Sequence, residues 1–320
     1  MNIKTITYQS VFIACFVFEA IGFAEDRVEL LHTLQGHTRW ISAVEYSPDG
    51  KMIASGSDDG TVILWDAQSG KKQFSLQNYD NALAFNHNGE LLAIGTLGKT
   101  ISVINLRTRE IKFTLQGHTE GLTAIEFSPD GKLLATASGD DTFIIWNLNN
   151  REPLHTLDHD NEYDISTVAF SPNGEQIVSG DGEGQLIVWA TNSGEELLVL
   201  DDHEGTVTSA MFSPDGKRIV SSSWDKSIIV WDSETGEMLK ALTGHTDVVT
   251  SISCNPNTNL LASTSEDNTL RIWNTTSGDQ IFSIEAHAND VTCIDYSSIG
   301  KQIVTGSNGE LRVWKVKSPF

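Results

Sequence analysis

The chain repeats itself from residue 28 onward, and this repetition constrains its fold more than any other feature of the sequence. Turn sequences such as "YSPDG", "FSPDG" and "FSPNG" recur with a period of about 42 residues. Aligning these turns places one residue from each repeat in a single column: Tyr46, Phe85, Phe127, Phe170, Phe212, Cys254 and Tyr296. The sequence therefore consists of seven similar units.

Each unit contains the same series of short segments. An apolar run such as "LLHTL" precedes a turn with histidine, and an alternating segment such as "ISAVEY" leads into the Pro-Asp-Gly turn, after which "MIASGS" and "TVILWD" follow. Alternation of period two, many Val, Ile, Thr and aromatic residues, and turn residues between the runs predict four β-strands in every unit. We therefore expect an all-β protein.

The period, the four strands, a "GH" dipeptide before the second strand and "WD" at the end of the fourth resemble the WD-repeat family. The resemblance covers nearly all of residues 25–320 and implies one domain there, a seven-bladed β-propeller with four antiparallel strands per blade around a central channel. Because the last unit stops after "ELRVWKV", the N-terminal "VELLHTL" should supply its outer strand. This pairing would close the ring and remove exposed sheet edges.

The family also carries a hydrogen-bonded tetrad of His, Ser or Thr, Asp and Trp in each blade. Buried imidazole, hydroxyl, carboxylate and indole groups all need hydrogen-bond partners, and a chain of four satisfies them mutually. We expect these residues to be structural. Four units match the spacing in full: His37, Ser55, Asp59 and Trp65; His118, Thr136, Asp140 and Trp146; His203, Ser221, Asp225 and Trp231; and His245, Ser263, Asp267 and Trp273.

Three units depart from this pattern. The fourth has Glu183 where the tetrad aspartate belongs, and the seventh offers Asn308. The second lacks "GH" and carries Ile94, Gly98 and Ile104 at the tetrad positions. Either the second blade has drifted to an apolar core, or it has been remodelled for a partner.

The repeated His, Ser and Asp residues do not indicate a catalytic triad, because no oxyanion-hole or nucleophile motif accompanies them. The histidines fall one per blade, and the acidic "DHDNEYD" lacks the spacing of a calcium loop, so we expect neither a metal nor a cofactor. The expected function is that of a non-enzymatic interaction scaffold. The alternative is a propeller enzyme or a lectin that uses the central channel.

The stretch "SSSWDKSIIVWD" contains two tryptophans with different predicted roles. Trp231 shares a column with the other tetrad tryptophans. Trp224 directly precedes Asp225, in a turn that the family places on the top face, where it either packs on its own turn or anchors a partner. Trp40 and Tyr163 lie in the other top-face loops of their units. Aromatic residues on a rigid rim are the type that anchors protein interfaces.

The formal net charge of −22 and the sequence pI of about 4.6 exclude a nucleic-acid partner, because phosphate binding needs a basic surface. Apart from Arg39, the charges expected on the top face are mostly acidic: Asp58, Glu120, Asp164, Glu204, Asp247, Glu266 and Asp290. We therefore expect a monomeric disc that binds a protein or peptide with a basic segment.

Residues 1–24 have the pattern of a secretory signal peptide. Lys4 precedes the apolar run "VFIACFVFEAIGFA", which closes on the small residues Gly22 and Ala24. The run is shorter than the roughly 20 apolar residues of a spanning helix, so we expect no stable membrane anchor. Cleavage after Ala24 would yield a secreted or periplasmic protein. A cytoplasmic protein is the alternative, because Glu19 is a poor residue for the core of a signal.

Overall fold

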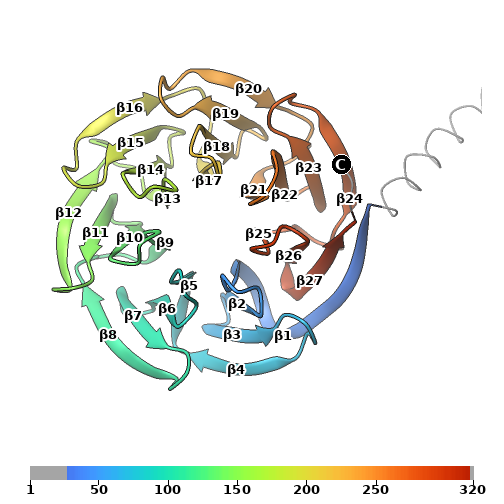
Figure 1. The fold of residues 1–320 in the computed structure, drawn as a ribbon, viewed down its shortest axis with the longest axis horizontal. Coiled ribbons are helices and arrows are strands. Elements are labelled where there is room, and N and C mark those ends of the chain that lie inside the picture. The colour runs from blue at the N-terminus through green and yellow to red at the C-terminus, as the bar shows by residue number, and fades with distance from the viewer. Residues whose placement is uncertain (1–26, 318–320) are drawn as a thin grey trace, which may run out of the picture.

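The computed structural model describes residues 27–317, and within them every regular element is a β-strand, which confirms the all-β prediction. The sheets stand around a central opening, with the first strand of most units nearest to it (Figure 1). The predicted signal peptide, residues 1–24, lies outside the described residues.

The strands of the first three units follow the predicted segments: β1 (Val28–Tyr46), β2 (Met52–Ser57), β3 (Thr61–Asp66), β4 (Lys72–Gln77), β5 (Tyr79–Phe85), β6 (Leu91–Thr96), β7 (Thr100–Asn105), β8 (Glu110–Gln116), β9 (Leu122–Phe127), β10 (Leu133–Ser138), β11 (Thr142–Asn147) and β12 (Glu152–Asp158). The fourth and fifth units contain β13 (Ile165–Phe170), β14 (Gln176–Asp181), β15 (Leu186–Ala190), β16 (Glu196–Leu200), β17 (Val207–Phe212), β18 (Arg218–Ser223), β19 (Ile228–Asp232) and β20 (Met238–Leu242). The last two contain β21 (Val249–Cys254), β22 (Leu260–Ser265), β23 (Thr269–Asn274), β24 (Gln280–Glu285), β25 (Cys293–Tyr296), β26 (Gln302–Gly306) and β27 (Asn308–Val316).

These strands form five four-stranded antiparallel sheets and one seven-stranded sheet of order β25-β26-β27-β1-β2-β3-β4. The long strand β1 accounts for the larger sheet. Its first half pairs with β27 from Val28 opposite Val316 onward, and its second half pairs with β2, with Val44 opposite Ser55. The seven-stranded sheet thus contains two four-stranded units that share β1. The pairing of the N-terminal segment with the last unit is the one the sequence predicts.

The core lies between neighbouring sheets. The second and third strands of each unit are almost wholly buried, as in β10, whereas outer strands such as β12 are largely exposed. Residues of adjacent sheets share apolar clusters; Phe212 of β17, for example, packs with Val178 of β14 and with Trp231. Because each sheet covers its neighbour, the molecule builds its core from repeated interfaces.

The first strands are also linked to one another by side chains that reach the next unit. Hydroxyl groups donate to backbone carbonyls of the following unit: Thr123 to Ile165 (2.5 Å), Ser166 to Val207 (2.5 Å), Thr208 to Val249 (2.6 Å), Thr250 to Val291 (2.5 Å) and Thr292 to Ile41. These hydrogen bonds give the backbone carbonyl groups partners and join neighbouring units.

Three carboxyl groups provide a second set of links near the opening. Glu45 accepts the backbone N–H of Phe85 (2.8 Å), Glu126 that of Phe170 (2.6 Å), and Asp295 that of Tyr46 (2.8 Å). Burial raises the pKa of Glu126 to about 8 and that of Asp295 to about 7. Burial, together with the charge of Asp295, raises the pKa of Glu45 well above its usual range.

The stability of Glu126→Gln relative to wild type should increase as the pH rises. The pKa of a glutamate in the unfolded chain is about 4.3. When folding raises the pKa, the contribution of the acid to stability is complete only at pH values below the unfolded pKa. This contribution is lost as the pH rises through the folded pKa of about 8. Urea unfolding of Glu126→Gln and wild type from pH 5 to 9 should show a difference in unfolding free energy that moves in favour of the variant by more than about 1 kcal/mol. The exposed Glu120→Gln is the matched control, and a constant difference across this range would contradict the assignment.

Candidate functional site

In five units, the segment that leads into the innermost strand meets the turn between the second and third strands at one end of the sheet; in the first unit this segment is part of the continuous strand β1. A backbone hydrogen bond joins them repeatedly: Asp58 N–H to Trp40 O, Gly139 to Gly121, Gly182 to Asp164, Trp224 to Thr206, and Glu266 to Val248, at 3.0–3.1 Å. We call the surface formed by these loops the top face. These hydrogen bonds tie the two segments together in the first, third, fourth, fifth and sixth units.

The four complete tetrads lie directly beneath the top face. In the first, Trp65 Nε1–H donates to Ser55 Oγ (2.9 Å), which lies 2.8 Å from His37 Nε2, and His37 Nδ1 lies 3.2 Å from Asp59 Oδ2. The same contacts occur at 2.7–3.0 Å in the other three: His118, Thr136, Asp140 and Trp146; His203, Ser221, Asp225 and Trp231; and His245, Ser263, Asp267 and Trp273.

Each tetrad also holds the loop above it. Asp59 accepts the backbone N–H of Thr38 (2.8 Å), and Asp225 accepts that of Glu204 (3.0 Å). The hydroxyl oxygen accepts the indole N–H, so its own hydrogen can be donated to Nε2 of the histidine. The histidine then carries its hydrogen on Nδ1 and donates it to the carboxylate. This arrangement needs a neutral imidazole, and burial lowers the pKa of His37 accordingly. The tetrads thus fix the top-face loops and leave no hydroxyl free to act as a nucleophile.

In the fourth unit the carboxylate is Asp181, and the prediction of Glu183 is wrong. His159 Nδ1 lies 3.0 Å from Asp181 Oδ2, and Ser179 Oγ bridges His159 (2.6 Å) and Trp189 (2.8 Å). The other Asp181 oxygen accepts the backbone N–H groups of the turn, including that of Glu183. Histidine and serine are 20 residues apart in this unit and 18 residues apart in the first tetrad. This difference in spacing is the feature of the sequence that could have indicated a different position for the tetrad carboxylate.

The seventh unit replaces the aspartate with a longer side chain, and the prediction of Asn308 is also wrong. His287 Nε2 lies 2.8 Å from Thr305 Oγ1, but its Nδ1 lies 3.6 Å from Glu310, which binds Arg312 at 2.7 Å. Asn308 instead pairs with Trp40 in the β1–β27 register. In the second unit, Ile94 and Ile104 are buried in an apolar cluster at the tetrad positions, while Gly98 lies in the exposed turn.

The aromatic candidates on the top face differ in exposure and position. Trp224 is 59% exposed and Tyr163 is 44% exposed, whereas Trp40 is half-buried. Tyr163 packs against Gly182. The Gly182 carbonyl accepts a hydrogen bond from the Thr206 hydroxyl (2.9 Å), and the Thr206 carbonyl accepts one from the backbone N–H of Trp224 (3.0 Å). The structure therefore brings Tyr163 and Trp224 onto neighbouring loops. Trp40 belongs to β1, on the other side of the opening from β18 and β19 (Figure 1).

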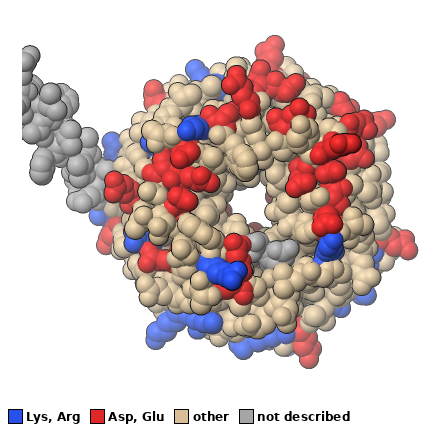
Figure 2. Space-filling model, turned by 180° about the vertical axis from the view of Figure 1, so that it is seen from behind, with Lys and Arg blue, Asp and Glu red and all other residues tan. Residues whose placement is uncertain are grey.

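The acidic candidates form two patches. Burial and the charges of Asp290 and Asp247 raise the pKa of Glu266, and the preceding residue, Ser265, donates its hydroxyl to the Asp247 carbonyl (3.1 Å). We call these three acidic residues the 6/7 patch. Asp141, whose pKa is raised by burial and by Asp164 and Glu162, defines the 3/4 patch with those two residues. On the face seen in Figure 2, acidic side chains gather in patches around the opening, and basic side chains are few.

The remaining charged candidates are also on the surface. Glu120 forms an ion pair with Lys99 (2.9 Å), and Lys226 lies 3.6 Å from Asp247, so two basic side chains of this face are already engaged. Asp58, Glu204 and Arg39 are exposed. Among residues 27–317, no three His, Cys, Asp or Glu side chains lie close enough together to hold a metal ion.

Known protein families agree with this architecture. The family model "WD domain, G-beta repeat" matches residues 28–66, 109–147, 151–190, 194–232, 236–274 and 278–315. The chain belongs to the WD-repeat family. The unmatched segment is the second unit, the one without a polar tetrad. Residues 27–317 of this WD-repeat protein contain no helical segment with the length and hydrophobicity that a membrane span requires.

Two curated relatives resemble parts of this chain. The WD-repeat protein is 31% identical over 122 residues to "WD repeat-containing protein SL1-17" of Schistosoma mansoni, a match that covers 37% of this chain and 40% of that protein. It is 28% identical over 138 residues to a component of chromatin assembly factor 1 of Mus musculus, covering 42% of this chain and 21% of that protein. The matched segments thus span less than half of either relative.

Proposed function

We propose that this WD-repeat protein is a non-enzymatic scaffold whose acidic top face binds a protein or peptide with a basic segment. WD-repeat proteins generally act as protein-interaction scaffolds. The observation that carries the proposal is Trp224, a large apolar side chain that stands 59% exposed on a loop fixed by the tetrad beneath it. A rigid aromatic side chain loses little conformational freedom on binding, so it is well suited to anchor a partner.

The two acidic patches support a basic partner. Like charges gathered around the mouth of an opening attract an oppositely charged ligand and increase the rate of encounter. Such rim charges contribute mainly to association rate and selectivity, while a desolvated aromatic anchor contributes most of the affinity. Tyr163, on the loop next to Trp224, extends the apolar part of this surface between the two patches.

Binding kinetics with a captured partner test the proposal. Trp224→Ala should raise the dissociation rate by about 30-fold, which corresponds to about 2 kcal/mol, with little change in association. Glu266→Gln with Asp247→Asn should mainly lower the association rate and its dependence on salt. Surface plasmon resonance at several salt concentrations separates the two effects.

Control variants on the outer strands make this test specific. Met238→Ala removes a side chain of similar exposure from β20, and Glu152→Gln with Glu196→Gln removes two exposed charges from β12 and β16. Neither control should alter either rate. If the top-face variants bind like wild type while a control variant loses affinity, the partner contacts the outer edge instead.

We further propose that the four-stranded units close into one seven-bladed, monomeric disc. The pairing of β1 with β27 and the Thr292–Ile41 hydrogen bond support this proposal.

We also propose that the protein is exported, because the segment before residue 25 has the pattern of a signal peptide. The intact mass of the native protein should then correspond to a chain that begins at Glu25. A cytosolic protein that retains Met1 to Ala24 would rule out export.

A further inference from the structure

One residue of the repeat column is far smaller than the others. Tyr46, Phe85, Phe127, Phe170, Phe212 and Tyr296 all bury an aromatic ring in the gap between their own sheet and the preceding one. In the sixth unit the column holds Cys254, which packs with Val220 between the fifth and sixth units. A thiol fills much less space than a ring, so the gap at this interface lacks its usual occupant.

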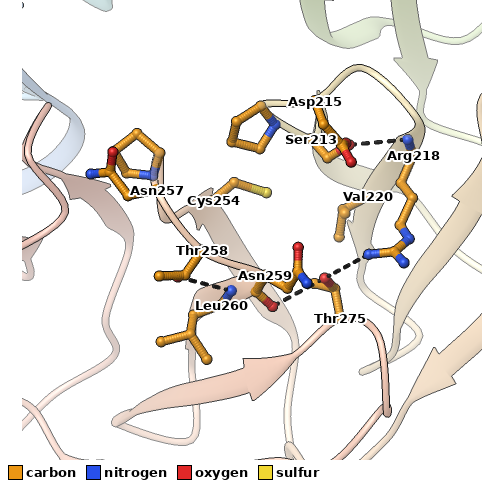
Figure 3. Close-up of a pocket in the computed structure, with 12 residues that line it drawn as sticks. Ser213, Asp215, Arg218, Val220, Cys254, Asn257, Thr258, Asn259, Leu260 and Thr275 are labelled. Atoms are coloured by element: carbon orange, nitrogen blue, oxygen red, sulfur yellow. Dashed lines mark hydrogen bonds between the residues drawn. The ribbon is translucent and has the colours of Figure 1, made fainter. Parts of the chain in front are cut away.

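A cavity of about 290 Å³ lies at this place and opens to the surface (Figure 3). Its walls come from both units: Ser213, Asp215, Arg218 and Val220 on one side, and Cys254, Leu260 and Thr275 on the other. The turn after β17 forms part of its rim, and this turn lies at the opposite end of the sheet from the top-face loops. The cavity is therefore separate from the binding face proposed above.

The valine opposite Cys254 is no larger than its counterparts in two other units. Val220 occupies the same strand position as Val178 and Val304, and those valines pack beside Phe212 and Tyr46 respectively. A valine opposite the column thus leaves room for a ring in two other units. The space at Cys254 is therefore not explained by a smaller residue at the Val220 position.

The rim of the cavity is polar and includes a cation. Arg218 donates from Nη1 to the hydroxyls of Thr275 (3.4 Å) and Thr276 (3.2 Å), and no carboxylate of residues 27–317 lies within salt-bridge distance of it. The corresponding positions of the other units hold uncharged side chains: Met52, Leu91, Leu133, Gln176, Leu260 and Gln302. A guanidinium beside an apolar slot can stack on an aromatic face or donate to a backbone carbonyl.

We propose that this cavity binds a phenylalanine or tyrosine side chain of a partner polypeptide. The ring would enter the slot that the chain's own rings occupy in six units, between Val220 and Cys254, with Arg218 at its edge. At the six equivalent interfaces between neighbouring units a Phe or Tyr ring fills the corresponding space, which is the reason for an aromatic occupant here. Burying the ring removes apolar surface from water and restores the packing that Cys254 lacks.

The probe for this site is N-acetyl-L-phenylalaninamide, which presents the ring as a polypeptide does. Titration followed by methyl NMR should shift the Val220 signals with a dissociation constant of about 1 mM, as expected for so small a ligand. N-acetyl-L-leucinamide is the matched aliphatic control and should bind at least about 10-fold more weakly. Trp224→Ala should leave binding of the probe unchanged. The result of this titration is therefore independent of the top-face proposal.

Filling the slot from within tests the same idea. Cys254→Phe should abolish binding of the probe and raise the unfolding midpoint, whereas Cys254→Ala should bind like wild type. Absence of Val220 shifts in the wild type, or unaltered binding to Cys254→Phe, would overturn the proposal. A Cys254→Phe chain that fails to fold would also contradict it, since the slot would then not accept a ring. Binding of free L-phenylalanine in preference to the amide would show that the occupant is not a polypeptide side chain.

Discussion

Replacing Trp231 by alanine is expected to lower the free energy of unfolding by about 3–5 kcal/mol, whereas replacing Trp224 should lower it by less than about 1 kcal/mol. Trp231 is 1% exposed, packs with Phe212 and Ile219, and donates its indole N–H to Ser221 (2.8 Å). Its loss creates a cavity and leaves a buried hydroxyl with one partner fewer. Trp224 makes no comparable contribution to the core, because its side chain stands in solvent.

Urea unfolding monitored by far-UV circular dichroism measures both effects on one scale. The two variants make the same chemical change seven positions apart in the chain, so each serves as the control for the other. Equal losses of stability would mean that Trp224 is part of the core, and the assignment of this residue to a binding surface would then be wrong.

Asp181→Ala is expected to cost about 3 kcal/mol of unfolding free energy, because it removes one member of a buried charged network. The side chain is fully buried, contacts His159 and Asn161, and accepts three backbone N–H groups of its turn. Glu183→Ala is the matched control, two residues further along the same turn, and should cost less than about 0.5 kcal/mol. A larger loss in Glu183→Ala than in Asp181→Ala would restore the alignment-based assignment.

The pH dependence of this pair follows from the same contacts. Burial acts to raise the pKa of Asp181, but the hydrogen bonds from His159, Asn161 and the turn outweigh it, so the pKa lies below its usual range. An acid with a depressed folded pKa stabilises the protein above its unfolded value of about 3.9, and this contribution is lost as the pH falls through the folded pKa. The difference between wild type and Asp181→Ala should therefore shrink on acidification below about pH 4.

Much of the fold could be predicted because the repeat supplies several copies of each signal. Tyr46, Phe127 and Phe212 mark equivalent strand ends, so a strand boundary missed in one unit is recovered from another. The pairing of the N-terminal segment with β27 could be predicted because the last unit lacks one strand and the segment before the first unit is a strand without an assigned partner.

The parts that sequence reasoning missed depend on where a backbone turn directs a side chain. Asp181 and Glu183 are both acidic, and only the course of the lengthened loop decides which one meets His159. Trp40 and Trp224 look equivalent as exposed aromatic candidates in the sequence. In the structure, β1, which carries Trp40, lies on the other side of the opening from β18 and β19, which flank Trp224 (Figure 1). The deviation at Cys254 is visible in the alignment, but the cavity becomes apparent only when the neighbouring sheet is in place.

Site-specific photocrosslinking tests the central claim, that the top face is the partner-binding surface, most directly. A benzophenone amino acid would be placed at residues 163 and 224, and separately at residues 111 and 238, which are exposed on the outer strands β8 and β20. Illumination in the native extract should join one partner protein to the variants at 163 and 224 and not to those at 111 and 238. Crosslinks that form only at 111 or 238 would contradict the account.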